Sequence, residues 1–314
     1  MDDDDAAAAL DVERSEREAF ADLLAAADGT EAAKLIRWWR QGRDGLAVSA
    51  PSLPMTLFNR VFGLGLEAGP DDDDALLADL AARLGPGRSP RFGIQPAPGP
   101  LGDAWRARLR TLGYEPRLQS LVQMARDLVV APQPAVPPAP GLALIEAGAA
   151  ESLAFATTAA TGFGMPPWFV PWLQRLPGRA GWHCFVALRA GTPVAAATLF
   201  VRAGIESGSG WLGIAATLPE SRGLGAQRSL MLARLALATR LGCRLATTET
   251  GGRSPASRTL PTATCWAAAS GKWRCARAGR RRREARLIRI RHQSHKNPPD
   301  WRGTSACAHR LRSG

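Results

Sequence analysis

The sequence predicts an α/β fold of the α+β type, in which a mixed, mostly antiparallel sheet is flanked by helices and the arrangement occurs in two tandem copies. Short apolar runs bounded by Pro or Gly, typical of strands, alternate with helical runs over residues 1–251. A Pro-rich stretch at 131–141, A-P-Q-P-A-V-P-P-A-P-G, separates these runs into two groups. The second group can be laid over the first in the same order, which indicates the tandem repeat.

In the first half, apolar periodicity and Pro or Gly boundaries define each element. The predicted helices are 13–24, 70–80 and 105–113, and the predicted strands are 44–50, 57–66, 91–95 and 118–124. In the second half, strands are predicted at 141–147, 182–189, 193–201, 210–217 and 243–250, with helices at 149–161, 168–176 and 226–240. The tripeptide A-G-T at 190–192 predicts a tight hairpin between two of these strands.

The composition fits a two-domain protein of the cytoplasm. The chain has 314 residues, of which 46% are apolar, enough for two ordinary domains. No apolar run reaches the roughly 18 residues of a membrane span. The first residues, M-D-D-D-D, are acidic where a signal peptide would be basic, and the five cysteines have no regular spacing. We therefore expect a cytoplasmic protein without a disulfide scaffold, a metal or a membrane partner.

The positive charge lies at one end of the chain. The formal net charge is +12, yet residues 252–314 hold 16 Lys and Arg against 2 acidic residues. The remaining 24 basic and 26 acidic residues leave residues 1–251 slightly acidic. The sequence therefore predicts no nucleic-acid surface on residues 1–251.

A short basic turn with two glycines lies between the strand 210–217 and the helix 226–240. Arg222, Gly223 and Gly225 follow Pro219 there. A helix start carries unpaired N–H groups and a partial positive charge, and glycine lets a ligand approach the backbone, so the turn predicts an anion site. It has neither the Gly-Lys-Ser/Thr of a Walker loop nor the third glycine of a dinucleotide fingerprint. An ordinary helix-entry loop is the alternative.

The order of elements over residues 142–251, with the turn Pro-x-x-Arg-Gly-x-Gly, resembles the GNAT (Gcn5-related) N-acetyltransferase superfamily. The family motif Arg/Gln-x-x-Gly-x-Gly/Ala binds the pyrophosphate of acetyl-CoA through backbone N–H groups. Its positions are filled here by Arg222, Gly223, Leu224, Gly225, Ala226 and Gln227. Gln227 departs from the Gly or Ala of the family, although its backbone N–H can still serve. The resemblance also implies that the backbone of Ala215, Ala216 and Thr217 contacts the pantetheine arm and the acetyl group.

The same resemblance implies direct attack of an amine on the thioester carbonyl, with a base or water chain that takes the proton. Glu249, on the strand after the helix, is our candidate for the base; a strand-end carboxylate facing water is the alternative. Many members use a Tyr after the fifth strand as general acid, but the only Tyr of this chain is Tyr114, in the first half. We expect Trp168 and Trp172 in the core, with a substrate groove as the alternative, and a structural role for His183.

The first half reads as a degenerate copy that does not bind CoA. Asp71 to Asp74 stand where the second half has its glycine turn, and four carboxylates there would repel a pyrophosphate. The literal R-V-F-G-L-G at 60–65 also fits the family motif, but it lies inside a predicted strand, so we interpret it as coincidence.

The stretch after Gly251 does not continue the family pattern. Residues 252–314 lack periodicity and include R-R-R-R at 280–283. Codon degeneracy allows a shifted frame over residues 261–276 in which a family-like Gly-Phe segment returns, so we hypothesise that the reading frame slipped near Gly252. A disordered basic extension and a nucleic-acid-binding tail are the alternatives.

These observations predict a degenerate GNAT-like domain at 1–130, a linker at 131–141, a C-terminally incomplete GNAT domain at 142–251 and the tail. The expected function is transfer of an acetyl group from acetyl-CoA, as co-substrate, to a primary amine of a small molecule or peptide, and a homodimer is left open. The alternatives are a non-catalytic CoA-binding pseudoenzyme and a nucleic-acid-binding protein.

Overall fold

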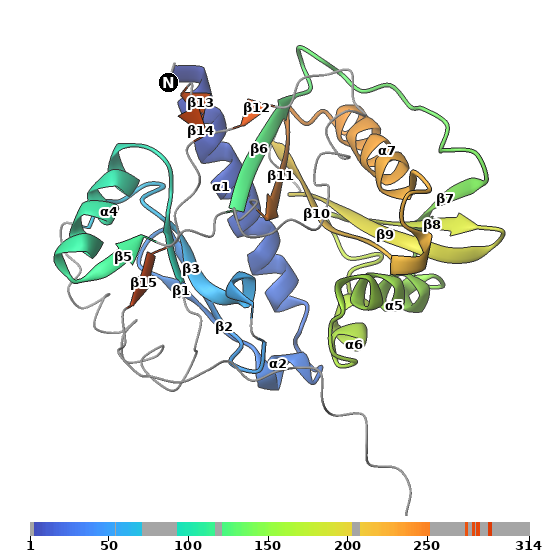
Figure 1. Cartoon of the computed structure of the whole chain (residues 1–314), viewed down its shortest axis with the longest axis horizontal. Helices are drawn as coiled ribbons and strands as arrows, with labels where there is room; N and C mark the ends of the chain where they lie inside the picture. Colours follow the sequence, from blue (N-terminus) through green and yellow to red (C-terminus); the bar gives the residue numbers. More distant parts are fainter. Residues whose placement is uncertain are drawn as a thin grey trace, which may run out of the picture.

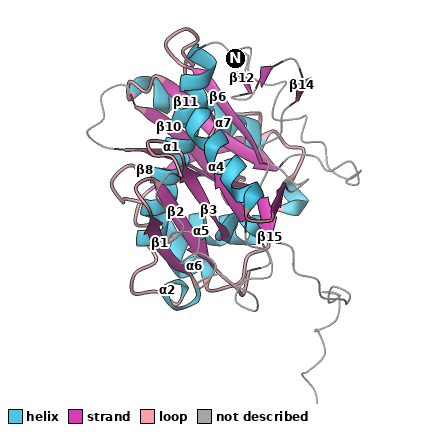
Figure 2. Ribbon diagram, turned by 90° about the vertical axis from the view of Figure 1, so that its left-hand side faces the viewer, coloured by secondary structure: helices cyan, strands magenta, loops and turns pink. Residues whose placement is uncertain are grey.

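The computed structural model describes residues 3–53, 55–70, 93–116, 121–202 and 208–251, and short strands at 274–275, 278–279, 281–282 and 288–290. Two large mixed sheets lie on either side of the long helix α1 (Asp3–Ala25), as Figure 1 shows. Figure 2 gives the side view of the strands and of the helices packed on them. This is the mixed α/β architecture with two sheets that the sequence predicts.

The first sheet has the strand order β1-β2-β3-β4-β15-β5. Its strands are β1 (Arg37–Gln41), β2 (Gly45–Ser49), β3 (Asn59–Leu64), β4 (Gly93–Pro96), β5 (Tyr114–Pro116) and β15 (Ile288–Ile290). Strand β2 is antiparallel to both β1 and β3, whereas β3 and β4 are parallel. Besides α1, the helical elements described in this half are α2 (Ala32–Leu35), the 3-10 turn η1 (Thr56–Phe58) and α4 (Pro100–Thr111).

The second sheet has the strand order β12-β6-β11-β10-β9-β8-β7. Its strands are β6 (Leu121–Asp127), β7 (Leu142–Ala147), β8 (Trp182–Arg189), β9 (Thr192–Val201), β10 (Ser209–Thr217), β11 (Leu245–Gly251) and β12 (Arg274–Cys275). Strands β7 to β10 are antiparallel in sequence, β10 and β11 are parallel, and β6 is antiparallel to β11. A separate pair joins β13 (Ala278–Gly279) to β14 (Arg281–Arg282).

Alternating side chains give the second sheet two apolar faces. On β8, Trp182 and Val186 join the cluster that contains α5 (Ser152–Phe163) and α6 (Phe169–Leu173), whereas Phe185 and Ala187 join the cluster of α7 (Ala226–Arg240). Both faces are covered because successive residues of a strand point to opposite sides.

Helix α1 closes one core against both sheets. The Phe20 ring makes edge contacts with Phe62 of β3, at 5.5 Å between centroids, and with Trp211 of β10, at 5.8 Å. The Trp172 indole N–H donates to the Leu23 carbonyl at 2.7 Å, so α6 is tied to the same helix. Buried aromatic side chains from both halves, among them Phe62 and Trp211, therefore belong to one cluster.

The two halves also exchange chain segments. Strand β6 precedes the Pro-rich stretch, yet all seven of its residues pair with β11 of the second sheet. The Pro-rich stretch at 131–141 then lies alongside α7. The Gln133 N–H donates to the Thr239 hydroxyl of that helix, and the Ala139 N–H donates to the Ser229 hydroxyl. The predicted boundary at 131–141 remains a prediction, and contacts between the halves cross it.

The predicted elements recur in order wherever the structure describes the chain, and the structure adds several short elements that were not predicted, namely α2, β1, β5 and β12 to β15. The sequence R-W-W-R-Q forms β1, which the apolar pattern did not predict because its charged residues interrupt the run. Asp71 to Asp74, with most of the predicted helix 70–80, lie outside the described residues, as does most of the tail at 252–314. Within the described ranges, none of the helices is long and apolar enough to cross a membrane.

We expect a fragment that begins at residue 131 to lack a cooperative fold. Such a fragment lacks α1 and β6, so Trp172 and Trp211 would be exposed and β11 would have lost its antiparallel partner β6. Urea unfolding followed by tryptophan fluorescence, with the fragment 1–251 as the control, tests this. A cooperative transition of fragment 131–314 at the midpoint of the full chain would contradict it.

Candidate active site

The parallel ladder between β10 and β11 is short. It joins Ser209, Gly210 and Trp211 to Leu245, Ala246 and Thr247, and it ends there although both strands continue. One residue further on, the Thr248 side-chain hydroxyl donates to the Leu212 carbonyl at 2.8 Å in place of a backbone donor. The later part of β10 therefore has backbone groups outside this ladder, as a strand that contacts an extended ligand requires.

A bulge in β10 lies just beyond the end of that ladder. Gly213 pairs with Thr198 of β9 and Ala216 with Ala196, so Ile214 and Ala215 stand opposite one residue. Ile214 has a positive φ of 44°, which is rare for a β-branched residue. Ala215, Ala216 and Thr217, the residues predicted to contact the pantetheine arm, complete the strand after this bulge.

The glycine turn joins the end of β10 to α7. After the 3-10 turn η2 (Pro219–Ser221), Gly223 has φ 82° and Gly225 has φ 81°, and Gly225 is the N-cap of α7. A methyl group added at Gly223 would meet nothing within 4 Å, so the backbone there is open. Arg222 is exposed, and Ala226 begins the helix. Open left-handed glycines before a helix N-terminus are what an anion-binding turn needs.

The Pro-rich stretch contacts this turn and the first turn of α7 through Ala139. A Cβ at Gly225 would come within 3.0 Å of the Ala139 side chain. The Ala139 N–H also binds the hydroxyl of Ser229, in the first turn of α7. Both contacts restrict the helix start, so its N–H groups keep a fixed direction.

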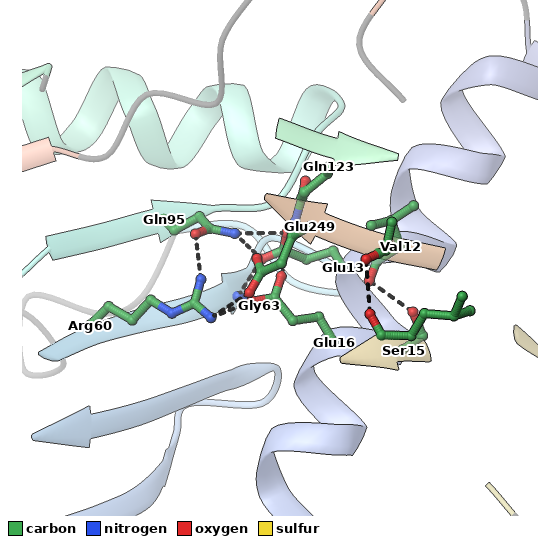
Figure 3. A network of polar contacts seen from close by, with 11 residues as sticks. Val12, Glu13, Ser15, Glu16, Arg60, Gly63, Gln95, Gln123 and Glu249 are labelled. Atoms are coloured by element: carbon green, nitrogen blue, oxygen red, sulfur yellow. Dashed lines mark hydrogen bonds and ion pairs between the residues drawn. The ribbon is translucent and has the colours of Figure 1, made fainter. Parts of the chain in front are cut away.

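Glu249 of β11 lies in a buried polar cluster rather than at the surface (Figure 3). Its side chain is 11% exposed, and one of its oxygens is 3.6 Å from the Arg60 guanidinium. Arg60, fully buried on β3, also forms an ion pair with Glu16 of α1 and donates to the Gln95 side chain at 2.9 Å. The water-facing alternative for Glu249 therefore does not match the structure.

Glu13 completes this cluster. Its carboxylate accepts the Gly63 N–H at 2.9 Å and the Gln123 amide at 2.7 Å. The cluster thus places three carboxyl groups, Glu13, Glu16 and Glu249, around one guanidinium (Figure 3). Burial, and next the charge of Glu16, raise the pKa of Glu249 well above its ordinary 4.5, against the opposing effect of Arg60.

The other predicted side chains lie at separate places. Trp172 is fully buried in the core, as predicted, and Trp168 packs at its edge. His183 contacts the Glu146 carboxylate at 2.8 Å on the outer strands β7 and β8. Tyr114 lies in the first sheet, against the cluster of α4. Of the described cysteines, Cys184 and Cys243 are both buried, which raises the thiol pKa and disfavours a cysteine nucleophile.

Sequence reasoning missed the partners of Glu249. Glu13 and Glu16 are three residues apart, so the helix brings them to one face, but acidic residues on a helix are usually solvated. Arg60 in an otherwise apolar strand was the available signal, because a strand cation between apolar residues needs a buried partner.

Comparison with known proteins gives the fold. No family model and no curated protein matches the chain. A tandem GNAT protein from the clavulanic acid biosynthesis pathway superposes with a TM-score of 0.52 at 17% identity, covering 92% of this chain and 98% of that chain. GCN5-related N-acetyltransferases from Sphaerobacter thermophilus and Kribbella flavida match with TM-scores of 0.45 and 0.47 and identities of 18% and 14%. These matches cover 81% and 88% of this chain and 85% and 94% of theirs. The superposition on the tandem protein shows that this chain has the tandem GNAT fold, as the sequence predicts.

The raised pKa of Glu249 gives a pH-dependent stability. A carboxyl group whose pKa is higher in the folded state stabilises the fold at low pH, and this stabilisation is lost as pH rises above 4.5 toward the folded-state pKa. Relative to Glu249→Gln, which cannot ionise, we expect the wild-type free energy of unfolding to fall by up to about 1.4 kcal/mol per pH unit in that range. Urea unfolding at several pH values checks this, and parallel curves for the two proteins would contradict it.

Proposed function

We propose that the chain is a GNAT-type N-acyltransferase that moves an acetyl group from acetyl-CoA to a primary amine. The turn at 222–227 carries the proposal, because its open left-handed glycines precede the N-terminus of α7. The bulge in β10 and the short β10–β11 ladder next to it support the same assignment. In this proposal residues 142–251 carry the site, and the first half, 1–130, does not bind CoA.

The chain supplies separate groups for each part of the reaction. Backbone N–H groups of Gly223 to Gln227 hold the pyrophosphate, and the backbone of Ala215 to Thr217 aligns the pantetheine arm. The amine nitrogen bonds to the thioester carbonyl carbon, the carbon–sulfur bond breaks, and the products are an amide and the CoA thiol. Glu249, once ionised, takes the proton that the amine loses, and its raised pKa makes it a stronger base than an ordinary carboxylate. Water supplies the proton that the thiolate takes up.

Binding and turnover test the proposal separately. Acetyl-CoA at about 100 times its dissociation constant should raise the melting temperature by roughly 5 °C or more. Thiol release with a panel of primary amines should then identify the acceptor. Absence of acetyl-CoA binding would contradict the assignment.

The pseudoenzyme is the second candidate. The Tyr of the chain lies in the first sheet, away from the second half's turn in sequence and sheet, and Arg60 holds Glu249 in an ion pair. Both observations favour a protein that binds acetyl-CoA without transferring its acetyl group. Acetyl-CoA binding with no thiol release above the hydrolysis rate for any amine would support this candidate.

We expect Gly223→Ala to weaken acetyl-CoA binding about tenfold or more, because an L-residue resists φ 82° and its methyl group would occupy the open space at the turn. Gly178→Ala is the matched control, since Gly178 has the same φ of 82° and the same open surroundings, outside the turn. Both variants should lose about 1–2 kcal/mol of stability. Equal acetyl-CoA affinity in the two variants, measured by calorimetry, would contradict the role of the turn.

We expect Glu249→Gln to lower kcat about 100-fold while acetyl-CoA affinity is retained, because the base is lost but the turn is not. Glu146→Gln, a substitution at a half-exposed carboxylate on β7, should leave kcat unchanged. An unchanged kcat and pH–rate profile in Glu249→Gln would contradict the role of Glu249 as the base and would assign proton removal to a chain of water molecules.

A further inference from the structure

Arg234 is a buried cation in the middle of α7. It is 1% exposed. Its Nε–H donates to the Leu230 carbonyl of its own helix at 3.1 Å. Its Nη1 donates to two carbonyls of the sheet, Thr198 at 2.9 Å and Gly213 at 3.3 Å. A buried guanidinium is costly unless its donors are used, so these contacts fix its place.

The two sheet carbonyls belong to one particular pair. Thr198 on β9 and Gly213 on β10 are cross-strand partners, and theirs is the last regular pair before the bulge at Ile214 and Ala215. A bulge interrupts the hydrogen-bond ladder, and here a side chain from the helix layer supplies donors at the point of interruption. The guanidinium thus contacts both strands at the pair after which their register changes.

The hydrogen bond to Gly213 also sets the direction of the next N–H. In a planar trans peptide, the C=O of Gly213 and the N–H of Ile214 belong to one unit and point in opposite directions. The Gly213 carbonyl is held toward α7, so the Ile214 N–H is turned away from α7. That is the face where the Ile214 side chain packs with the α1, α5 and α6 cluster, and where Glu249 and Glu16 of α1 both contact Arg60.

We propose that Arg234 is a positioning residue for acyl transfer: from α7, its guanidinium fixes the Gly213–Ile214 peptide so that the Ile214 N–H is directed at the acyl carbonyl oxygen. The inference rests on the proposed function. A donor fixed in advance stabilises the negative charge that develops on that oxygen during attack, and it needs no reorganisation during the reaction. A loosened peptide would still allow acetyl-CoA to bind at the glycine turn, because residues 222–227 lie at the start of α7, about two helical turns before Arg234.

The experiment compares Arg234→Met, which keeps an unbranched apolar stem without donors, with Arg234→Lys, which keeps the charge. Arg240→Met, an exposed position at the end of the same helix, is the control for loss of a cation from α7. We would measure the dissociation constant of [1-13C]acetyl-CoA, the 13C chemical shift of its bound carbonyl, and kcat with the amine of the panel that gives the highest kcat. Circular dichroism and the melting temperature establish that each variant is folded.

We expect Arg234→Met to bind acetyl-CoA within about threefold of wild type, to lose most of the bound-state carbonyl shift, and to lower kcat about 10- to 100-fold. Arg234→Lys should be intermediate, and Arg240→Met should match the wild type. A folded Arg234→Met with the wild-type carbonyl shift and kcat would overturn the inference. If Arg234→Met does not fold, wild-type values in Arg234→Lys would overturn it and intermediate values would support it. Failure of the wild-type protein to bind acetyl-CoA would instead contradict the proposed function.

Discussion

Two sheets share helix α1, and the polar side chains of that helix must be satisfied from both sides at once. Toward the first sheet, Glu16 pairs with Arg60 and Glu13 accepts the Gly63 N–H. Toward the second, the Ser15 and Thr247 hydroxyls share a hydrogen bond of 2.7 Å, and Asp22 binds Arg179 and Trp182. Removing one partner of a buried ion pair costs about 3–5 kcal/mol, so the first sheet cannot move away from α1 without leaving the buried charge of Arg60 or Glu16 alone. Movement of the second sheet would break the buried hydrogen bond between Ser15 and Thr247.

Side chains of the first half therefore form part of the surroundings of Glu249, in the second half. Arg60 comes from β3, yet it contacts the carboxyl group of Glu249 on β11. On this account, mutations in β3 would affect the electrostatics around Glu249 as directly as mutations in β11.

The local features were predictable from the sequence, and the long-range ones were not. The glycine turn and the hairpin at Ala190–Thr192 have signatures of a few adjacent residues, because positive φ and a helix start select Gly locally. Pairing of β6 with β11 has no such signature, since strand partners are selected by contacts distant in sequence. The surroundings of Glu249 and the bond from Arg234 to the bulge were missed for the same reason. The residue type of a charged side chain does not indicate whether it is buried or solvated, because burial depends on contacts that are distant in sequence.

The pairing of β6 with β11 has a consequence for biosynthesis. Residues 121–127 leave the ribosome long before residues 245–251. Strand β6 therefore has no β11 to pair with while the hairpin, the glycine turn and α7 are synthesised. Open edges of this kind favour association between nascent chains. Chaperones should therefore bind the nascent chain from the emergence of β6 until β11 has emerged. The two halves then complete their folding together rather than one after the other.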